Sequence, residues 1–282
     1  MCRWLAYSGP PIFLEDLIVK PSRSLLVQSQ FARENYVTNI EGLPDGAYPI
    51  NGDGFGIGWY GEREEPGVYR DLRPAWSDEN LLHLSRQIRS SLFLAHLRAA
   101  YNGIVQRSNN HPFAWRNWLF QHNGEISGYP QIKRVLQSQL REDLFTQIRG
   151  TTDSETAFYL AITLGLEQDP KAAMEAMVGT VEQIRQQAGI KAPAVFTCAL
   201  ADGENIYAVR YSSDRNSKSL YVNRDRSGME ELMGETTPRR AAHIILSEPL
   251  DDCSDHWEAV PESSFVSVRN GRLTIEPFNP TA

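Results

Sequence analysis

The sequence predicts an α+β protein in which two β-sheets are covered by helices, as a layered sandwich. Strand-like segments fill the first third of the chain, helix-like segments the middle, and strand-like segments again the last third. No Pro/Ser-rich linker, internal repeat or low-complexity run interrupts this order. We therefore expect residues 2–282 to form a single domain, with core motifs in 2–166 and C-terminal strands in 194–277 that complete the sheets.

The first predicted strand contains Trp4 to Tyr7, whose apolar and aromatic side chains are typical of a buried strand. We expect this strand to end at Pro10–Pro11, because proline donates no hydrogen bond to a β-ladder. A short amphipathic helix is predicted at 22–31. An exposed loop is predicted at 42–54, which is rich in Gly, Pro, Asn and Asp.

Residues 53–61 alternate glycine with large apolar residues and predict a strand with one glycine face. Such a face lets another backbone approach closely, and we interpret it as the place where two sheets pack tightly. A Gly-x-Gly run can also bind phosphate, but no helix follows it as a dinucleotide fold requires. Residues 68–71 are predicted to pair with this strand as a hairpin.

A helix at 78–91 is predicted from leucines and an isoleucine spaced along one apolar face. It leads into a buried strand at 91–95, which brings Arg98 to its end. A guanidinium at such a strand end can hold a carboxylate with two hydrogen bonds, although a surface or ion-paired arginine is the commoner case. The next predicted strand, 118–122, is expected to break at Asn123–Gly124.

The clearest predicted helix spans 152–166, and Thr152 and Glu155 form a capping box at its start. A further helix is predicted at 171–187. Apolar runs then predict the strands of the last third, which ends in a hairpin around Asn270–Gly271. These strands are expected at 194–200, 205–211, 220–223, 241–246, 265–268 and 273–277.

Composition excludes several classes of protein. With 41% hydrophobic and 22% charged residues the chain has an ordinary soluble composition, without the run of about 18 apolar residues that a membrane span needs. A net charge of −7 without a Lys/Arg patch argues against nucleic-acid binding. Three cysteines without a CxxC pair and six histidines without metal-ligand spacing indicate no disulfide framework and no metal. We expect a cytoplasmic protein without a signal peptide or cofactor.

Cys2 follows the initiator methionine and becomes the first residue if Met1 is removed. We expect this removal, because cysteine is small enough for the processing aminopeptidase. It then carries a thiol and a free α-amine, whose ordinary pKa of about 7.7–8.0 leaves part of it unprotonated near neutral pH. Nucleophile and base on one residue are the N-terminal form of nucleophilic catalysis. An incidental cysteine is the alternative when this feature is considered alone.

Three other local features are candidates for a site. Asn123–Gly124 offers a side-chain amide and an unhindered N–H that can stabilise an oxyanion, although a simple turn is the commoner use of this pair. Asp153 lies in the first turn of a predicted helix, where the helix dipole favours a carboxylate and a ligand's ammonium could bind. His111 lies in a loop anchored by Phe113, and we expect a hydrogen-bonded structural histidine rather than an acid or base.

Together these motifs resemble the class II glutamine amidotransferases, which are N-terminal-nucleophile (Ntn) hydrolases with a four-layer αββα fold. The resemblance covers roughly residues 2–270 and is strongest to the stand-alone branch, which includes the ergothioneine-pathway γ-glutamyl hydrolase and the glutathione-degradation subunit. Six motifs carry it in order: Met-Cys-Arg-Trp-Leu-Ala-Tyr at 1–7, Gly-Phe-Gly-Ile-Gly-Trp at 54–59, Ala-His-Leu-Arg-Ala at 95–99, Asn-His-Pro-Phe at 110–113, Gln-His-Asn-Gly-Glu-Ile at 121–126 and Thr-Asp-Ser-Glu at 152–155.

The resemblance implies roles for these residues. Cys2 would attack a γ-glutamyl amide, with Asn123 and Gly124 holding the oxyanion, and the resulting thioester would be hydrolysed to glutamate. Arg98 would bind the substrate α-carboxylate and Asp153 its α-ammonium, while His111 belongs to the same substrate-binding wall. The implied substrate is a small molecule with a free γ-glutamyl head group, either glutamine or a larger γ-glutamyl metabolite.

One departure bears on the partners of the protein. Amidotransferases with synthetase partners usually carry a threonine after the arginine, in a His-x-Arg-Trp-Ala-Thr run, whereas this chain has Arg98-Ala99-Ala100-Tyr101. Two other interpretations stay open: a non-catalytic module that binds γ-glutamyl compounds, and an ammonia-supplying subunit that works with a synthetase or hydrolase partner.

Overall fold

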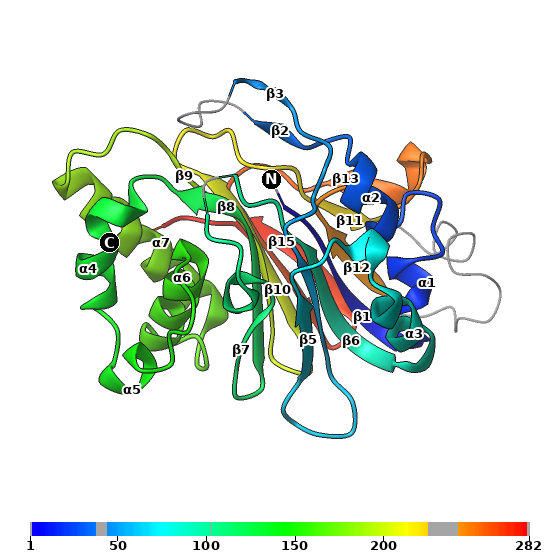
Figure 1. Ribbon diagram of the computed structural model, residues 1–282. Coiled ribbons are helices and arrows are strands. Elements are labelled where there is room, and N and C mark those ends of the chain that lie inside the picture. The colour runs from blue at the N-terminus through cyan, green and yellow to red at the C-terminus, as the bar shows by residue number, and fades with distance from the viewer. Residues whose placement is uncertain (1, 38–43, 102, 225–241, 281–282) are drawn as a thin grey trace.

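The computed structural model describes residues 2–37, 44–101, 103–224 and 242–280. Met1, the start of the loop predicted from Gly42, and Ala241 of the predicted strand 241–246 lie outside the described residues. Two antiparallel sheets lie face to face, with one group of helices outside each sheet (Figure 1). This is a four-layer αββα sandwich, so the predicted fold class is confirmed.

Within the described residues the first sheet has seven strands and the second has six, and a small two-stranded hairpin is separate from both. In spatial order the first sheet contains β13 (Trp257–Ala259), β11 (Tyr221–Asn223), β12 (His243–Leu246), β1 (Arg3–Phe13), β6 (Arg89–Leu97), β4 (Phe55–Trp59) and β5 (Gly67–Asp71). The second contains β15 (Arg272–Pro277), β14 (Ser264–Arg269), β10 (Ile206–Ser212), β9 (Ala194–Ala201), β8 (Trp118–Ile126) and β7 (Phe113–Trp115). The small hairpin consists of β2 (Tyr36–Val37) and β3 (Gly46–Ala47).

Helices cover the outer face of each sheet (Figure 1). The first sheet is covered by α1 (Glu15–Ile18), α2 (Leu25–Phe31) and α3 (Glu79–Gln87). The second is covered by α4 (Tyr129–Gln137), α5 (Glu142–Phe145), α6 (Asp153–Thr163) and α7 (Pro170–Gln187). Three short 3₁₀ turns complete the described elements: η1 (Ala75–Ser77), η2 (Arg107–Asn109) and η3 (Ser254–His256).

The alternation of side chains along β1 shows why a strand near the N-terminus is apolar on both faces. Trp4 and Ala6 pack between the two sheets, whereas Leu5 and Tyr7 pack toward the helices α1–α3. All four side chains are fully buried. Because helices cover the outside of the sheet, neither face of β1 meets water between Arg3 and Tyr7, and the buried strand predicted here is confirmed.

The glycine face of β4 lies against the second sheet. A Cβ atom added to Gly56 would come within 2.1 Å of the His111 carbonyl oxygen, and one on Gly58 within 2.8 Å of both Leu119 and Pro112. The two sheets therefore approach each other more closely here than any side chain would permit. The predicted tight packing and the hairpin between β4 and β5 are both confirmed.

Two strand boundaries were predicted wrongly. β1 does not end at Pro10–Pro11: its pairing with β6 shifts register after Ser8 and resumes at Ile12. The irregularity takes up the prolines, so the ladder continues beyond them. β8 does not break at Asn123–Gly124 but runs to Ile126, because β9 pairs with it along its whole length and supplies the partners that a turn would have replaced.

The helices predicted at 22–31, 78–91 and 152–166 are present, with corrections to their ends. The helix predicted at 78–91 ends at Gln87, and the one predicted at 22–31 begins after the cap Ser24. Thr152 accepts the backbone N–H of Glu155, but the Glu155 carboxylate turns to the N–H groups of 149 and 150, so only half of the capping box forms. Asn270 and Gly271 both adopt positive φ, as a tight hairpin turn requires.

Within the described residues, no helix is both long enough and apolar enough to cross a membrane.

Candidate active site

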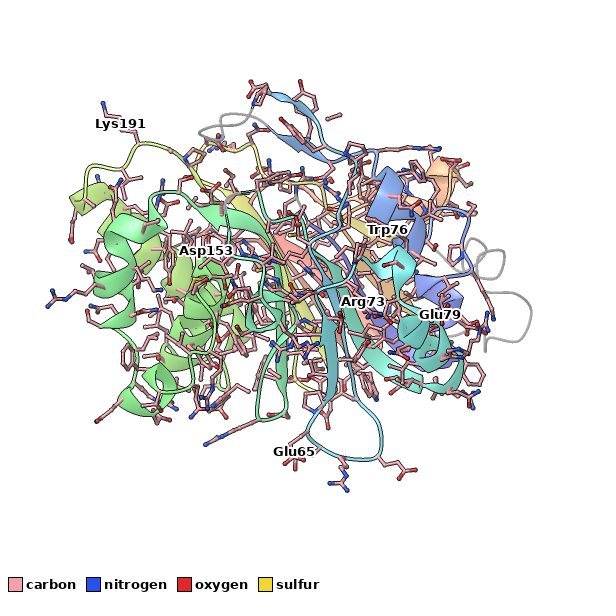
Figure 2. All side chains as sticks on the ribbon, in the orientation of Figure 1. Glu65, Arg73, Trp76, Glu79, Asp153 and Lys191 are labelled. Atoms are coloured by element: carbon pink, nitrogen blue, oxygen red, sulfur yellow. The ribbon has the colours of Figure 1, made fainter. Side chains whose placement is uncertain are left out.

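A cavity of about 420 Å³ opens where β1, β6 and β8 meet the start of α6. Its wall includes all six residues that the sequence predicts for the site: Cys2, Arg98, His111, Asn123, Gly124 and Asp153. They lie in or next to strands of both sheets and at the start of one helix, and in the sequence they are up to 151 positions apart, from 2 to 153. Figure 2 labels Asp153 where the helical layer meets the second sheet.

Strand pairing places Cys2 beside Arg98. β1 and β6 are antiparallel with Arg3 opposite Leu97, so the residue before Arg3 faces the residue after Leu97. The partly buried Cys2 side chain has its sulfur 4.0 Å from the carbonyl oxygen of Ala99. The register of β1 and β6 thus brings Cys2 next to Arg98, and this register could not be read from the spacing of the two residues in the sequence.

A buried ionic network anchors the strand that carries Cys2. The Arg3 guanidinium donates to the Ser247 carbonyl at 3.0 Å and lies 3.8 Å from the Glu248 carboxylate. Glu248 also accepts hydrogen bonds from the backbone N–H groups of Arg33 and Glu34. Since both charges are fully buried, this network holds the first residues of β1 against the edge of the sheet.

Arg98 is 5% exposed, so it is not the surface arginine considered as an alternative. Its Nη2 donates to the carbonyl of Ile104 at 3.1 Å, whereas its Nη1 is buried and has no hydrogen-bond partner among the described residues. Burial lowers the pKa of Arg98, and the nearby Asp53 and Asp153 act in the opposite direction. A guanidinium remains charged in such a setting, and the Nη1 group of Arg98 keeps donors without a partner in the described structure.

Asn123 presents a second unsatisfied donor. Along β8, Leu119, Gln121 and Asn123 alternate onto the inner face, and Gln121 donates to the Leu5 carbonyl of β1 across the sheets. Asn123 therefore faces the end of β1 where Cys2 lies. Its Nδ2 is buried without a hydrogen-bond partner in the described part of the chain. A buried free amide donor costs stability unless a ligand uses it.

Gly124 must be glycine where it stands. A Cβ there would lie 2.0 Å from the Val195 carbonyl oxygen and 2.4 Å from Nε2 of His122. The neighbouring β9 strand and the histidine occupy the space that a side chain would need. Gly124 is also part of the cavity wall.

Asp153 is the first residue of α6, and its carboxylate is firmly held. One oxygen accepts the N–H of Ile126 at 2.7 Å, and the other accepts the N–H of Ser154 at 2.7 Å. The helix dipole further favours the anion at this position. Among the described residues neither Asp153 nor Arg98 forms an ion pair, so these two opposite charges in the cavity wall do not neutralise each other.

His111 lines the cavity but is not the hydrogen-bonded histidine that we expected. It is 4% exposed, and neither ring nitrogen has a hydrogen-bond partner in the described structure. Its ring packs against His96 and Phe113, with centroids 4.3 and 4.6 Å away. Burial lowers the pKa of His111 well below 6.5, so the ring is neutral at physiological pH.

Two further histidines were not predicted for the site. His122 lines the cavity, with Nδ1 2.9 Å from the Ser154 hydroxyl and Nε2 3.0 Å from the Val195 carbonyl. The ring of His96, whose pKa burial lowers to about 3, has Nε2 3.1 Å from the His122 carbonyl. Each of these histidines stands inside one of the motifs already recognised, and this was the signal available in the sequence.

The arrangement suits a zwitterionic ligand beside a thiol. A cation and an anion face the same space as the thiol and an amide donor, and no group of three or more potential metal ligands occurs among the described residues. An amino acid head group needs one fixed positive and one fixed negative partner. The same cavity can therefore orient such a group and stabilise an oxyanion formed at the thiol.

Comparison with known proteins gives one consistent family. The family model of class II glutamine amidotransferases matches residues 37–281. The Saccharomyces cerevisiae protein named "probable glutamine amidotransferase DUG3" is 31% identical over an alignment of 310 positions, which covers 99% of this chain and 84% of the relative. The γ-glutamyl-hercynylcysteine sulfoxide hydrolase of Mycolicibacterium smegmatis is 26% identical, over 99% of this chain and all of the relative.

Comparison with solved structures gives the same type of protein. A glutamine aminotransferase class-II domain protein from Silicibacter pomeroyi has a TM-score of 0.72 and 30% identity, covering 99% of this chain and 100% of that one. The glutamine phosphoribosylpyrophosphate amidotransferase of B. subtilis has a TM-score of 0.61 over 99% of this chain and 49% of its own. At 12% identity the second similarity shows the fold alone.

Proposed function

Because this chain belongs to the class II glutamine amidotransferases, which act on C–N bonds, we propose that it hydrolyses the amide of a γ-glutamyl compound with Cys2 as nucleophile. The observation that carries the proposal is a pair of buried donors on one cavity wall, Arg98 Nη1 and Asn123 Nδ2, that have no partners among the described residues. Each costs stability in the free protein, and each has the chemistry of a substrate contact.

Recognition comes first in this mechanism. The guanidinium of Arg98 binds the substrate α-carboxylate, and the carboxylate of Asp153 binds the α-ammonium. Asp153 can accept this further hydrogen bond because each carboxylate oxygen has two lone pairs. The neutral ring of His111 packs in the same wall without adding a charge that would compete with either contact.

The chemical step then proceeds at Cys2. With Met1 removed, the α-amine of Cys2 accepts the thiol proton, and the sulfur attacks the γ-carbonyl carbon. The Asn123 amide and the Gly124 N–H stabilise the oxyanion of the tetrahedral intermediate. When this collapses, the C–N bond breaks and the α-ammonium protonates the leaving amine. Water then attacks the γ-glutamyl thioester, and glutamate leaves with the thiol restored.

Two rival functions make different predictions. The Mycolicibacterium relative is named a hydrolase of γ-glutamyl-hercynylcysteine sulfoxide, and this name supports hydrolysis of a γ-glutamyl metabolite. An ammonia-supplying subunit would instead co-purify with a synthetase or hydrolase partner and release glutamate mainly in that complex. A non-catalytic module would bind γ-glutamyl compounds without consuming them.

We also propose that residues 2–282 act as one domain and that the protein works in the cytoplasm, where a free thiol nucleophile stays reduced.

Glutamate release by the purified protein tests the proposal. Glutamine and a γ-glutamyl dipeptide are supplied in parallel, and intact-mass measurement establishes whether Met1 is absent. We expect turnover by the wild type and none by Cys2→Ala or Cys2→Ser. The exposed thiol of Cys253 offers a matched control, and Cys253→Ala should retain full activity. Turnover that survives in Cys2→Ala, or its absence from a wild type shown to lack Met1, would contradict the mechanism.

A further inference from the structure

Lys218 lines the same cavity but has no part in the mechanism above. It lies in the segment between β10 and β11, and its side chain is partly buried. Its ammonium makes no hydrogen bond or ion pair with any described residue. Surface lysines are often solvated and unpaired, but this one stands in the wall of a ligand-sized cavity.

The backbone of Lys218 is held in place beside the site. Its carbonyl accepts a hydrogen bond from the hydroxyl of Thr197 at 3.3 Å, and Thr197 is the strand partner of Asn123. The next residue, Ser219, donates to the carbonyl of Ser247 at 2.8 Å. The segment is therefore tied to both sheets, and the lysine projects from a fixed point next to the amide donor Asn123.

The electrostatic neighbours of Lys218 differ from those of Arg98. Burial and the nearby Arg3 guanidinium lower the pKa of Lys218, whereas Asp214 and Glu125 act in the opposite direction. Asp214 and Glu125 also line the cavity, yet neither forms an ion pair with the lysine in the described structure. The cavity thus has a second cation close to the strand of Cys2, separate from the cation proposed to hold the glutamyl head group.

A cation that is partly removed from water without a partner is costly, and an anion of the ligand would offset that cost. The α-carboxylate of the glutamyl group is already assigned to Arg98. Any anion for Lys218 must therefore belong to the other side of the scissile amide. Glutamine has no such anion, because its leaving group is ammonia. An amino acid or peptide attached through the γ-amide does have one, its own carboxylate.

We propose that Lys218 binds a carboxylate on the leaving-group side of the substrate and so selects γ-glutamyl amino acids and peptides over glutamine. The inference rests on the proposed hydrolysis at Cys2. A cavity of about 420 Å³ suits it, since pockets of roughly 300–1,000 Å³ hold ligands well above the size of one amino acid. Hydrogen bonds to a charged group are strong enough for a selectivity of about ten- to a hundredfold.

A matched pair of substrates isolates the lysine. γ-Glutamylglycine carries the leaving-side carboxylate, and γ-glutamylglycinamide is nearly isosteric but neutral there. We compare the ratio of their kcat/KM values in the wild type, Lys218→Met, Lys218→Arg and Lys218→Glu. Lys191→Met serves as the matched control, because Lys191 is exposed and points away from the molecule in Figure 2.

We expect the wild type to favour the acid by about ten- to a hundredfold, with a preference that weakens as ionic strength rises. Lys218→Met should bring the ratio close to one, Lys218→Arg should keep a preference for the acid, and Lys218→Glu should reverse it. Lys191→Met should keep the wild-type ratio. A wild-type kcat/KM ratio near one, or a Lys218→Met variant that keeps the preference for the acid, would overturn the inference about Lys218. Hydrolysis of either substrate in that case would still support the proposed function. Absence of turnover on both substrates and on glutamine would instead contradict the proposed function.

Discussion

Replacing Asn123 by alanine should lower kcat strongly while changing the free energy of unfolding only a little. The Asn123 Nδ2 group is buried and makes no hydrogen bond with the described residues, so its removal breaks none in the folded protein. We expect the free energy of unfolding to change by no more than about 1 kcal/mol, because the loss of side-chain packing is offset by the removal of an unsatisfied donor. Removing one oxyanion donor typically lowers kcat by about 10²–10³-fold, or about 2.7–4 kcal/mol in the transition state.

Gln121 provides the matched control on the same strand and face. Its amide is equally buried, but Nε2 donates to the Leu5 carbonyl at 2.9 Å, across the two sheets. Gln121→Ala should therefore destabilise the fold by about 1–3 kcal/mol more than Asn123→Ala, since it leaves a buried carbonyl unpaired. Denaturant unfolding measures stability, and glutamate release under saturating substrate measures kcat. If Asn123→Ala keeps the wild-type kcat, or loses as much stability as Gln121→Ala, the assignment of the amide to the oxyanion is refuted.

Two further predictions concern charge. Arg98→Lys should raise KM for γ-glutamyl substrates by about ten- to a hundredfold, because an ammonium lacks the planar fork with which a guanidinium binds a carboxylate through two parallel hydrogen bonds; an unchanged KM would exclude this contact. Burial lowers the pKa of His96 to about 3 in the folded protein, so this histidine takes up a proton more readily in the unfolded chain. The free energy of unfolding therefore has its full value, as far as His96 is concerned, above about pH 6.5 and falls as the pH decreases toward 3. Denaturant unfolding between pH 7 and 4 should show the free energy of unfolding fall by up to about 1.4 kcal/mol per pH unit through this histidine. The fall should be shallower in His96→Gln, and equal falls in the two proteins would contradict the prediction.

The strand and helix pattern was largely predictable because it depends on local composition. Apolar runs, the cap at Thr152 and the Asn270–Gly271 turn act over a few residues, and each is present in the structure. The glycine face of β4 was also interpretable, since glycines that alternate with large side chains let an opposing layer approach the strand closely.

The errors came where a neighbouring strand overrode the local signal. Asn123–Gly124 has the composition of a turn, but β9 pairs with both residues and keeps them extended. Pro10–Pro11 normally ends a ladder, but a register shift lets β1 and β6 pair again beyond it. A β-ladder is formed with residues far away in the chain, so local composition cannot decide where it ends.

The sequence by itself determined the order of the elements, the fold class and the identity of the six candidate site residues, because those depend on residue types and on motifs that survive in one dimension. Only the tertiary structure decided how the site is assembled. The pairing of β1 with β6 sets Cys2 beside Arg98, the alternation along β8 turns Asn123 toward the same point, and the segment between β10 and β11 brings in Lys218. Which polar atoms remain unpaired depends on every neighbour in space, and these atoms indicate what the cavity can bind.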